Sequence, residues 1–392
     1  MRTVLEHIGN CKTEALGGHQ ITCGACQSEI YSWNSCGDSH CPQCQNIKKE
    51  LWVDKMANHL LPIKHFHIIF TLPHELNDLI FYNQTACYSM LFKSSWEAIC
   101  AIIGLENRTG MVATLHTWGS NLSFHPHLHC IIPSGSYDGQ HWKLSQYNNG
   151  RFYCKASDLR ETFTRIFSVK LRELIETETL YYDGESMVGH PESWIKVNRI
   201  IEKISKKKWS VRIENPVLGT EQIIEYLGRY VRRVAITNSR IEAVDQSGVT
   251  INYKKYAQQK KGKPAPIGAK VMKGEAFLQQ FCQHILPFRF HRIRYYGIYG
   301  FAAKKIKTDI YTQLTNQPIG VYQPPSSKQI IEKMLGHHPD ICSTCGVVNQ
   351  MESIPLLVDS SKLFVLTRKY ANPQIRAGPV TKRLQISIGS VF

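Results

Sequence analysis

The chain has 392 residues, which is long enough for two or three domains that each bury a core of their own. Lysine and arginine outnumber aspartate and glutamate by 47 to 31, and the formal charge of +16 favours a polyanionic partner such as nucleic acid. No apolar run reaches the roughly 18 residues that span a bilayer, and no signal-peptide pattern opens the chain. We therefore expect a cytoplasmic protein without a membrane partner.

The first 50 residues hold six of the thirteen cysteines and have little apolar periodicity. In a chain without an export signal, such a cluster indicates metal binding rather than disulfides. The paired knuckles Cys23-x2-Cys26 and Cys41-x2-Cys44 are typical of one tetrahedral, structural zinc site. The residues interleaved with them could form a second zinc site or share ligands with the first; these are Cys11, His19, Cys36 and His40.

A further Cys-x2-Cys pair stands far along the chain, at Cys342 and Cys345, and follows His337 and His338. It could be another knuckle. A single pair is a weak signal, so we assign it no metal.

After residue 50, hydrophobic periodicity predicts helices that alternate with strands. The helical segments are residues 51–60, 76–103, 157–178, 221–234 and 275–286. The predicted strands are residues 65–72, 111–118, 124–132, 208–213 and 249–253. The turn at Gly119-Ser120-Asn121 makes residues 111–132 an antiparallel hairpin, and residues 134–150 and 260–264 read as loops. Together these elements indicate an α+β fold with a central antiparallel sheet flanked by helices.

The second strand of the predicted hairpin contains His127 and His129, whose side chains project from the same face of the strand. Two imidazoles placed in this way suit a divalent cation. We choose His116 as the third ligand. The turn at Gly119-Ser120-Asn121 would place its strand beside the strand that carries His127 and His129. The other candidates are His65, His67, Gln222 and His125, the last of which could instead contact phosphate.

The predicted helix 221–234 carries Tyr226 and Tyr230 four residues apart, on one face. A tyrosine hydroxyl has a pKa of about 10, so it needs a metal or nearby cations to act as a nucleophile. Spacing alone would favour an aromatic pair packed on the core, but the order of the motifs and the neighbouring arginines favour nucleophiles. The cationic candidates for contacts with DNA are Arg229, Arg232, Arg233, Lys206, Lys207 and Lys208.

Five segments, in this order along the chain, resemble the two-tyrosine HUH (His-hydrophobic-His) rolling-circle transposases of bacterial insertion sequences. They are the zinc head (residues 23–44), the opening strand (68–73), the HUH motif (124–133), the tyrosine helix (226–236) and the closing segment (284–297). The spacing from His116 to the HUH motif also resembles the three-histidine site of conjugative relaxases. Two departures from the family pattern stand out. Val231-Arg232 replaces an expected Thr-His pair, and Cys282 and Phe288 are unusual in the closing segment. They bear on the details of the substrate more than on the chemistry.

The resemblance implies a zinc-binding DNA-recognition head (residues 1–50), an HUH nuclease and transposase domain (60–236) and a basic accessory region (237–392). It implies structural Zn²⁺, catalytic Mg²⁺ or Mn²⁺, and tyrosines that cut and rejoin single-stranded DNA through 5′-phosphotyrosine links during rolling-circle transposition. The partners would be single-stranded DNA, hairpin ends of the mobile element and target DNA, in the bacterial cytoplasm.

Two alternatives stay open at this point. One is a plasmid replication initiator or relaxase of the same chemistry, against which the zinc head and the closing segment argue. The other is a non-catalytic, zinc-dependent DNA-binding regulator. The sequence leaves the oligomeric state and the order in which the tyrosines act undetermined.

Overall fold

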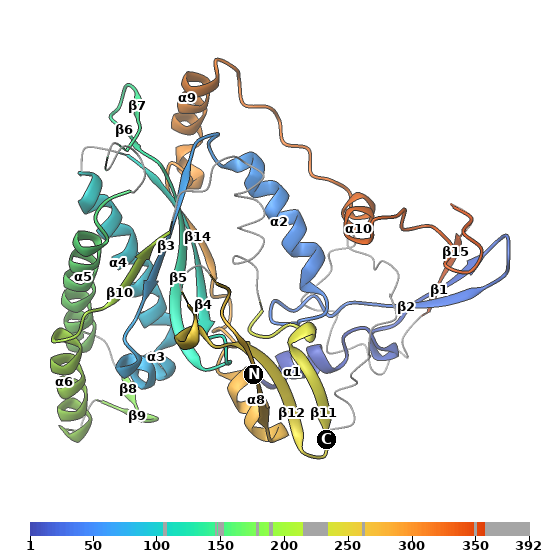
Figure 1. Cartoon of the computed structure of the whole chain (residues 1–392), viewed down its shortest axis with the longest axis horizontal. Coiled ribbons are helices and arrows are strands. Elements are labelled where there is room, and N and C mark those ends of the chain that lie inside the picture. The colour runs from blue at the N-terminus through green and yellow to red at the C-terminus, as the bar shows by residue number, and fades with distance from the viewer. Residues whose placement is uncertain are drawn as a thin grey trace. The chain divides into compact units, whose positions relative to one another are not determined.

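The structure, a computed structural model, describes residues 1–104, 108–145, 147, 153–177, 180–187, 191–214, 234–260, 263–348 and 351–356. These residues form two compact units (Figure 1). The first unit gathers the described parts of Met1–Lys55, Arg232–Ile285 and Gln323–Phe392, and the second those of Met56–Val231 and Leu286–Tyr322. The units therefore interleave along the chain, whereas the sequence suggested three consecutive segments.

The second unit is built on a five-stranded antiparallel sheet, which confirms the predicted central antiparallel sheet. In spatial order its strands are β10 (Ser210–Ile213), β3 (His65–Thr71), β5 (Phe124–Pro133), β4 (Gly110–Trp118) and β14 (Ile293–Gly297). The predicted hairpin is confirmed by the pairing of β4 with β5. The edge strand β14 comes from the region that we expected to be accessory, so part of that region completes the central sheet.

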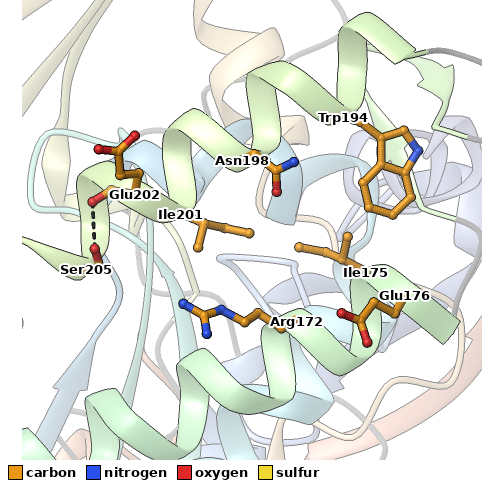
Figure 2. A pocket seen from close by; sticks show the side chains of 8 residues that line it. All are labelled: Arg172, Ile175, Glu176, Trp194, Asn198, Ile201, Glu202 and Ser205. Carbon is orange, nitrogen blue, oxygen red and sulfur yellow. Dashed lines mark hydrogen bonds between the residues drawn. The ribbon is translucent and has the colours of Figure 1, made fainter.

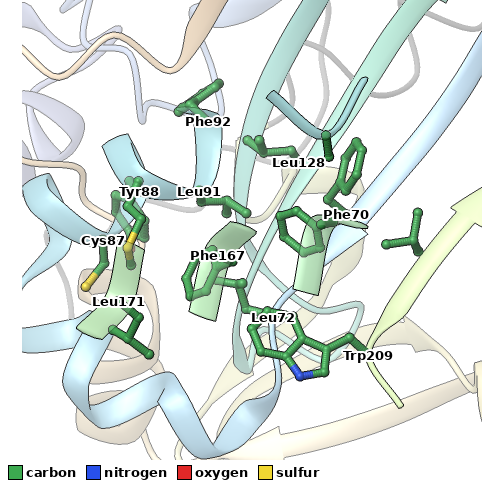
Figure 3. Close-up of a cluster of buried hydrophobic side chains, with 14 of the residues drawn as sticks. Phe70, Leu72, Cys87, Tyr88, Leu91, Phe92, Leu128, Phe167, Leu171 and Trp209 are labelled. Atoms are coloured by element: carbon green, nitrogen blue, oxygen red, sulfur yellow. The ribbon is translucent and has the colours of Figure 1, made fainter. Parts of the chain in front are cut away.

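Strand alternation gives this sheet two different faces. On β3, Phe66, Ile68 and Phe70 are fully buried in an apolar core, and the intervening His65 and His67 project from the opposite face. The core lies under helices gathered on one side of the sheet (Figures 1 and 3). These helices are α3 (Asn77–Tyr82), α4 (Gln84–Ile103), α5 (Ala156–Thr177) and α6 (Pro191–Ser205).

The predicted helix over residues 76–103 is in fact two helices, because the helical backbone is interrupted at Asn83. The Asn83 backbone leaves the helical region, with φ −126° and ψ 42°. Its side-chain amide nitrogen donates to the carbonyl oxygens of Leu79 (2.7 Å) and Tyr181 (2.6 Å), and its amide oxygen accepts from the Tyr181 backbone nitrogen (2.9 Å). A side chain that bonds to distant backbone in this way competes with helix continuation.

The remaining elements of the second unit are short or peripheral. They are the end of α2 (Gln45–His59), β6 (Ser136–Tyr137), β7 (Trp142–Lys143), β8 (Tyr181–Tyr182), β9 (Glu185–Ser186) and α9 (Lys304–Thr315). None of the helices in the described part of the chain is both long enough and apolar enough to cross a membrane.

The first unit contains two three-stranded antiparallel sheets, and one of them includes strands of residues 1–50, where the sequence predicted no element. One sheet has the order β15 (Met351–Leu356), β1 (Gly18–Cys23), β2 (Glu29–Trp33), and the other β11 (Ile241–Asp245), β12 (Gly248–Lys254), β13 (Ile267–Met272). Its helices are α1 (Arg2–Gly9), most of α2, α8 (Gly274–Cys282) and α10 (Ser327–Leu335). The head thus pairs with a strand from more than 300 residues later in the chain.

Candidate metal centres

Three histidines meet on the face of the five-stranded sheet that lies opposite the apolar core. His116 on β4 is the direct cross-strand partner of His127 on β5, and His129 lies two residues further along β5. One ring nitrogen from each of the three lies within 4.8 Å of the others. The structure therefore brings together the three residues that we selected from the sequence.

The Nε2 atoms of His127 and His129 are only 3.1 Å apart. His127 donates from Nδ1 to the carbonyl oxygen of His125 at 2.7 Å, which leaves its Nε2 with a lone pair. Adjacent ligands at about 2.1 Å from an octahedral ion lie about 3.0 Å apart. The observed separation therefore fits two imidazoles that share one divalent cation.

His129 is held in place by a second layer of contacts. Its Nδ1 lies 2.8 Å from Nε2 of His67, and the planes of the two rings are 2° apart. His67 in turn places Nδ1 3.5 Å from a carboxylate oxygen of Glu214. A carboxylate and an imidazole behind a ligating histidine fix its tautomer and its orientation.

Burial favours the neutral form of His127 and of His67, and metal ligation by His127 requires that form. It lowers the pKa of His127 to about 4 and the pKa of His67 to about 3, in each case with a smaller contribution from neighbouring positive groups. His116 is only 4% exposed, and its ring stacks on Trp118 with centroids 4.6 Å apart. The candidate site is therefore lined by three imidazoles and one indole ring.

The other sequence candidates occupy different positions. His67 stands behind His129, and His65 places Nε2 2.6 Å from the hydroxyl of Tyr299. The His125 ring lies 5.2 Å from the ring of His127, and burial lowers its pKa. Gln222 lies outside the described residues, as do Tyr226, Tyr230, Arg229, Arg232 and Arg233.

The lysine run follows helix α6. The Lys206 ammonium pairs with Glu202 at 2.7 Å, and Lys207 pairs with Glu75, which also lies 3.4 Å from Lys203. All three lysines of the run are exposed. Two of them, Lys206 and Lys207, form ion pairs that the charge pattern of the sequence did not indicate.

Eight cysteines of the first unit form two clusters of four. The first cluster is Cys11, Cys36, Cys41 and Cys44, and the second is Cys23, Cys26, Cys342 and Cys345. In each, sulfur atoms lie 3.7 Å apart, as between Cys36 and Cys44. Thiolates at about 2.3 Å from a tetrahedral zinc lie about 3.8 Å apart, so both clusters fit Zn²⁺.

The expected grouping of the two N-terminal knuckles around one ion is not what the structure contains. Cys23 and Cys26 sit at the end of β1 beside the distant Cys342 and Cys345, while Cys41 and Cys44 lie with Cys11 and Cys36. His19 and His40 belong to neither cluster: His19 lies 3.2 Å from the Ser353 hydroxyl, and His40 lies 3.0 Å from the Asp38 carboxylate. Each knuckle stays intact, but the two N-terminal knuckles belong to different clusters.

A pocket of about 340 Å³ lies between α5 and α6, on the helical side of the second unit (Figure 2). Arg172 of α5 and Trp194 and Glu202 of α6 are among the side chains that line it. It is separated from the histidines by the apolar core and the sheet. No sequence candidate in the described part of the chain lines this pocket.

Comparison with known proteins defines the class. Residues 1–72 match the family model described as "Transposase zinc-binding domain", and residues 110–307 match the one described as "Putative transposase". The first match contains all six N-terminal cysteines, and the second contains His116, His127, His129 and the strand β14. The chain is a transposase with a zinc-binding domain.

The relatives make the family more specific. The chain is 30% identical to "Putative transposase y4qJ" of Sinorhizobium fredii, over 88% of this chain and 86% of that protein. It is 25% identical to the transposase for insertion sequence element IS801 of Pseudomonas savastanoi pv. phaseolicola, over 73% of this chain and 67% of that protein. It belongs to the IS91/IS801 family of insertion-sequence transposases. No solved structure matches it.

Proposed function

We propose that this transposase nicks and rejoins single-stranded DNA through 5′-phosphotyrosine intermediates, and that it moves an insertion sequence by a rolling-circle route. The observation that carries the proposal is the convergence of His116, His127 and His129 on one face of the central sheet. Three imidazoles, one of which is backed by His67 and through it by Glu214, are suited to a catalytic ion with open positions.

His116, His127 and His129 would hold Mg²⁺ or Mn²⁺. That ion would supply a Lewis acid for the scissile phosphate and would stabilise the charge that develops on its oxygens. The residues of the chain position the ligands: His67 orients His129, the His125 carbonyl oxygen orients His127, and Trp118 limits the movement of His116.

Tyr226 and Tyr230 are the proposed nucleophiles. The phenolic oxygen of one tyrosine attacks the phosphorus, the bond from phosphorus to the 3′ oxygen breaks, and the leaving strand takes up a proton to become a free 3′-OH. The phosphotyrosine bond keeps the energy needed for resealing. The second tyrosine can cut another strand while the first is occupied.

An extended single strand is the substrate that this arrangement favours. The reacting phosphate must lie in line with a tyrosine and beside the histidines, and a paired strand would obstruct that approach. Arg229, Arg232, Arg233 and the lysines at 206–208 are the proposed phosphate contacts, so binding should weaken steeply as salt rises. The hairpin ends of the element and a target strand would be its DNA partners in the bacterial cytoplasm.

The test uses purified protein with labelled single-stranded and duplex oligonucleotides that contain an element end, with and without Mg²⁺ or Mn²⁺. We expect metal-dependent cleavage of the single strand and little cleavage of the duplex. The Tyr226→Phe/Tyr230→Phe double variant should bind DNA and leave it intact. Binding without any cleavage by the wild-type protein would favour the non-catalytic regulator instead. Equal cleavage of both DNA forms would contradict the proposed single-stranded substrate.

A further inference from the structure

We propose that Cys23, Cys26, Cys342 and Cys345 form a second zinc site. Its four thiolates would link the N-terminal head to the segment that contains Cys342, Cys345 and strand β15. The match to the zinc-binding domain ends at residue 72, so it contains only half of these ligands. The site goes beyond the proposed DNA chemistry and does not depend on it.

The sulfur positions fit one tetrahedral ion. Cys23 lies 3.7 Å from Cys345, Cys26 lies 3.7 Å from Cys342, and all four sulfurs are within 4.8 Å of one another. A disulfide would require a sulfur separation of about 2.05 Å, and none is present among these four residues. Four thiolates at tetrahedral spacing are the donor set of a closed, structural zinc site.

The two halves of the site have the same backbone turn. The amide of Gln27 donates to the carbonyl oxygen of Cys23 (2.8 Å), and the amide of Gly346 donates to that of Cys342 (2.9 Å). The residue four positions after the first cysteine has positive φ in both knuckles, 57° at Gln27 and 76° at Gly346. Two equivalent turns that face each other are what a zinc ribbon requires, and chance packing of two loops would not produce them.

The first cysteine of each knuckle closes its turn in the same manner. The Cys23 amide donates to the Ser28 carbonyl oxygen at 3.0 Å, and the Cys342 amide donates to the Val347 carbonyl oxygen at 2.9 Å. The Ser28 hydroxyl also lies 3.1 Å from the sulfur of Cys26 and 3.4 Å from that of Cys342. A hydroxyl between two sulfurs stabilises thiolates and helps to orient them toward an ion.

The sheet formed by β15, β1 and β2 indicates that a zinc ion here would hold strand β15 against the head. β15 pairs with β1 along its whole length, from Gly18 opposite Leu356 to Cys23 opposite Met351. Only Cys23 and Cys342 are buried, whereas Cys26 and Cys345 are exposed. A cluster with so little apolar cover needs the metal to fix strand β15 on the head.

The first experiment measures zinc per chain in the full-length protein by elemental analysis. Cys342→Ser/Cys345→Ser should lose one equivalent of zinc relative to wild type, whereas the control Cys100→Ser/Cys282→Ser, whose cysteines lie outside both clusters, should lose none. An unchanged zinc content in the Cys342/Cys345 variant would refute the site, and iron in place of zinc would refute the metal.

The second experiment uses the wild-type protein, so it does not depend on the folding of a variant. N-ethylmaleimide should modify the exposed Cys26 and Cys345 at least 10-fold more slowly in the zinc-loaded protein than after zinc removal by a chelator, as read by peptide mass spectrometry. Because both thiols are open to solvent, only a bound metal would protect them. Rapid modification of Cys345 in the zinc-loaded protein would overturn the proposal.

Discussion

At the scale of single residues, the histidine face is arranged so that nitrogen lone pairs, and not protons, point at the candidate metal position. The His125 carbonyl oxygen accepts a hydrogen bond from Nδ1 of His127, and Nε2 of His67 is hydrogen-bonded to Nδ1 of His129. Both rings therefore present Nε2 inward, 3.1 Å apart. Sequence spacing selected His116, His127 and His129 as the candidate ligands and kept His67 as an alternative ligand, but it did not indicate that His67 lies behind His129.

The role of His67 as a positioning residue leads to a prediction about metal affinity. His67→Leu removes the partner of His129 Nδ1, and loss of such an outer contact typically weakens metal binding about 10- to 100-fold. His67→Gln keeps a side-chain amide and should recover part of the loss. Mn²⁺ titration followed by electron paramagnetic resonance measures both, with His74→Leu at an exposed position as the control. Wild-type affinity in His67→Leu would contradict this role.

His65 makes a second residue-scale prediction, on stability and pH. Its Nδ1 donates to the Ile63 carbonyl oxygen (2.9 Å), and Nε2 accepts from the Tyr299 hydroxyl (2.6 Å), so the buried ring is neutral and burial lowers its pKa to about 4. The unfolded chain binds this proton at its ordinary pKa of about 6.5, so the stabilisation is complete above that pH and is lost as pH falls toward 4.

Between pH 7 and pH 5 we expect His65 to account for about 2 kcal/mol of lost unfolding free energy. Urea denaturation of wild type and His65→Gln across this range measures it. The variant should have a shallower dependence on pH. Parallel curves for the two proteins would show that His65 does not titrate as described.

At the scale of elements, the apolar core determines where the histidine face lies. Phe70 of β3 meets Phe163 of α5 with ring centroids 4.9 Å apart, on the side of the strand away from the histidines. Phe167 of α5 adds contacts to Trp209, with centroids 5.3 Å apart. Figure 3 shows Phe70, Phe167 and Trp209 together in this cluster.

Phe167→Ala should therefore destabilise the protein by about 3–5 kcal/mol, because it leaves a cavity in a fully buried cluster. The matched control is Val169→Ala on the same helix, where the side chain is half exposed and the cost should be within about 0.5 kcal/mol. Denaturant unfolding compares the two. Similar losses for both variants would mean that α5 does not pack as described.

The alternation of apolar and polar residues predicted the strands of this core well. Alternation on β3, β4 and β5 follows directly from which side chains face the helices, so the strands could be located from the sequence. The break at Asn83 could not, since it depends on a hydrogen bond to Tyr181, almost a hundred residues away. Strands β1 and β2 were missed because their burial pattern is irregular.

At the scale of the whole molecule, pairing across long sequence distances was the part that the sequence did not reveal. Strand β14 completes the central sheet from a region that we expected to be accessory, and Cys342 and Cys345 join Cys23 and Cys26. In each case the sequence showed a local motif but not the segment with which it pairs. Residue spacing gives information about neighbours along the chain and not about neighbours in space. The knuckles at 23–26 and 41–44 looked like one site for this reason.

The proposed function requires that DNA become joined to a tyrosine of this transposase. The most direct measurement is peptide mass spectrometry of the covalent product formed with a single-stranded oligonucleotide and Mn²⁺. We predict a nucleotide attached through its 5′ phosphate to Tyr226 or Tyr230, and no such peptide from His127→Ala. A nucleotide on any other residue, or a cleaved strand with no protein-linked nucleotide, would contradict the account.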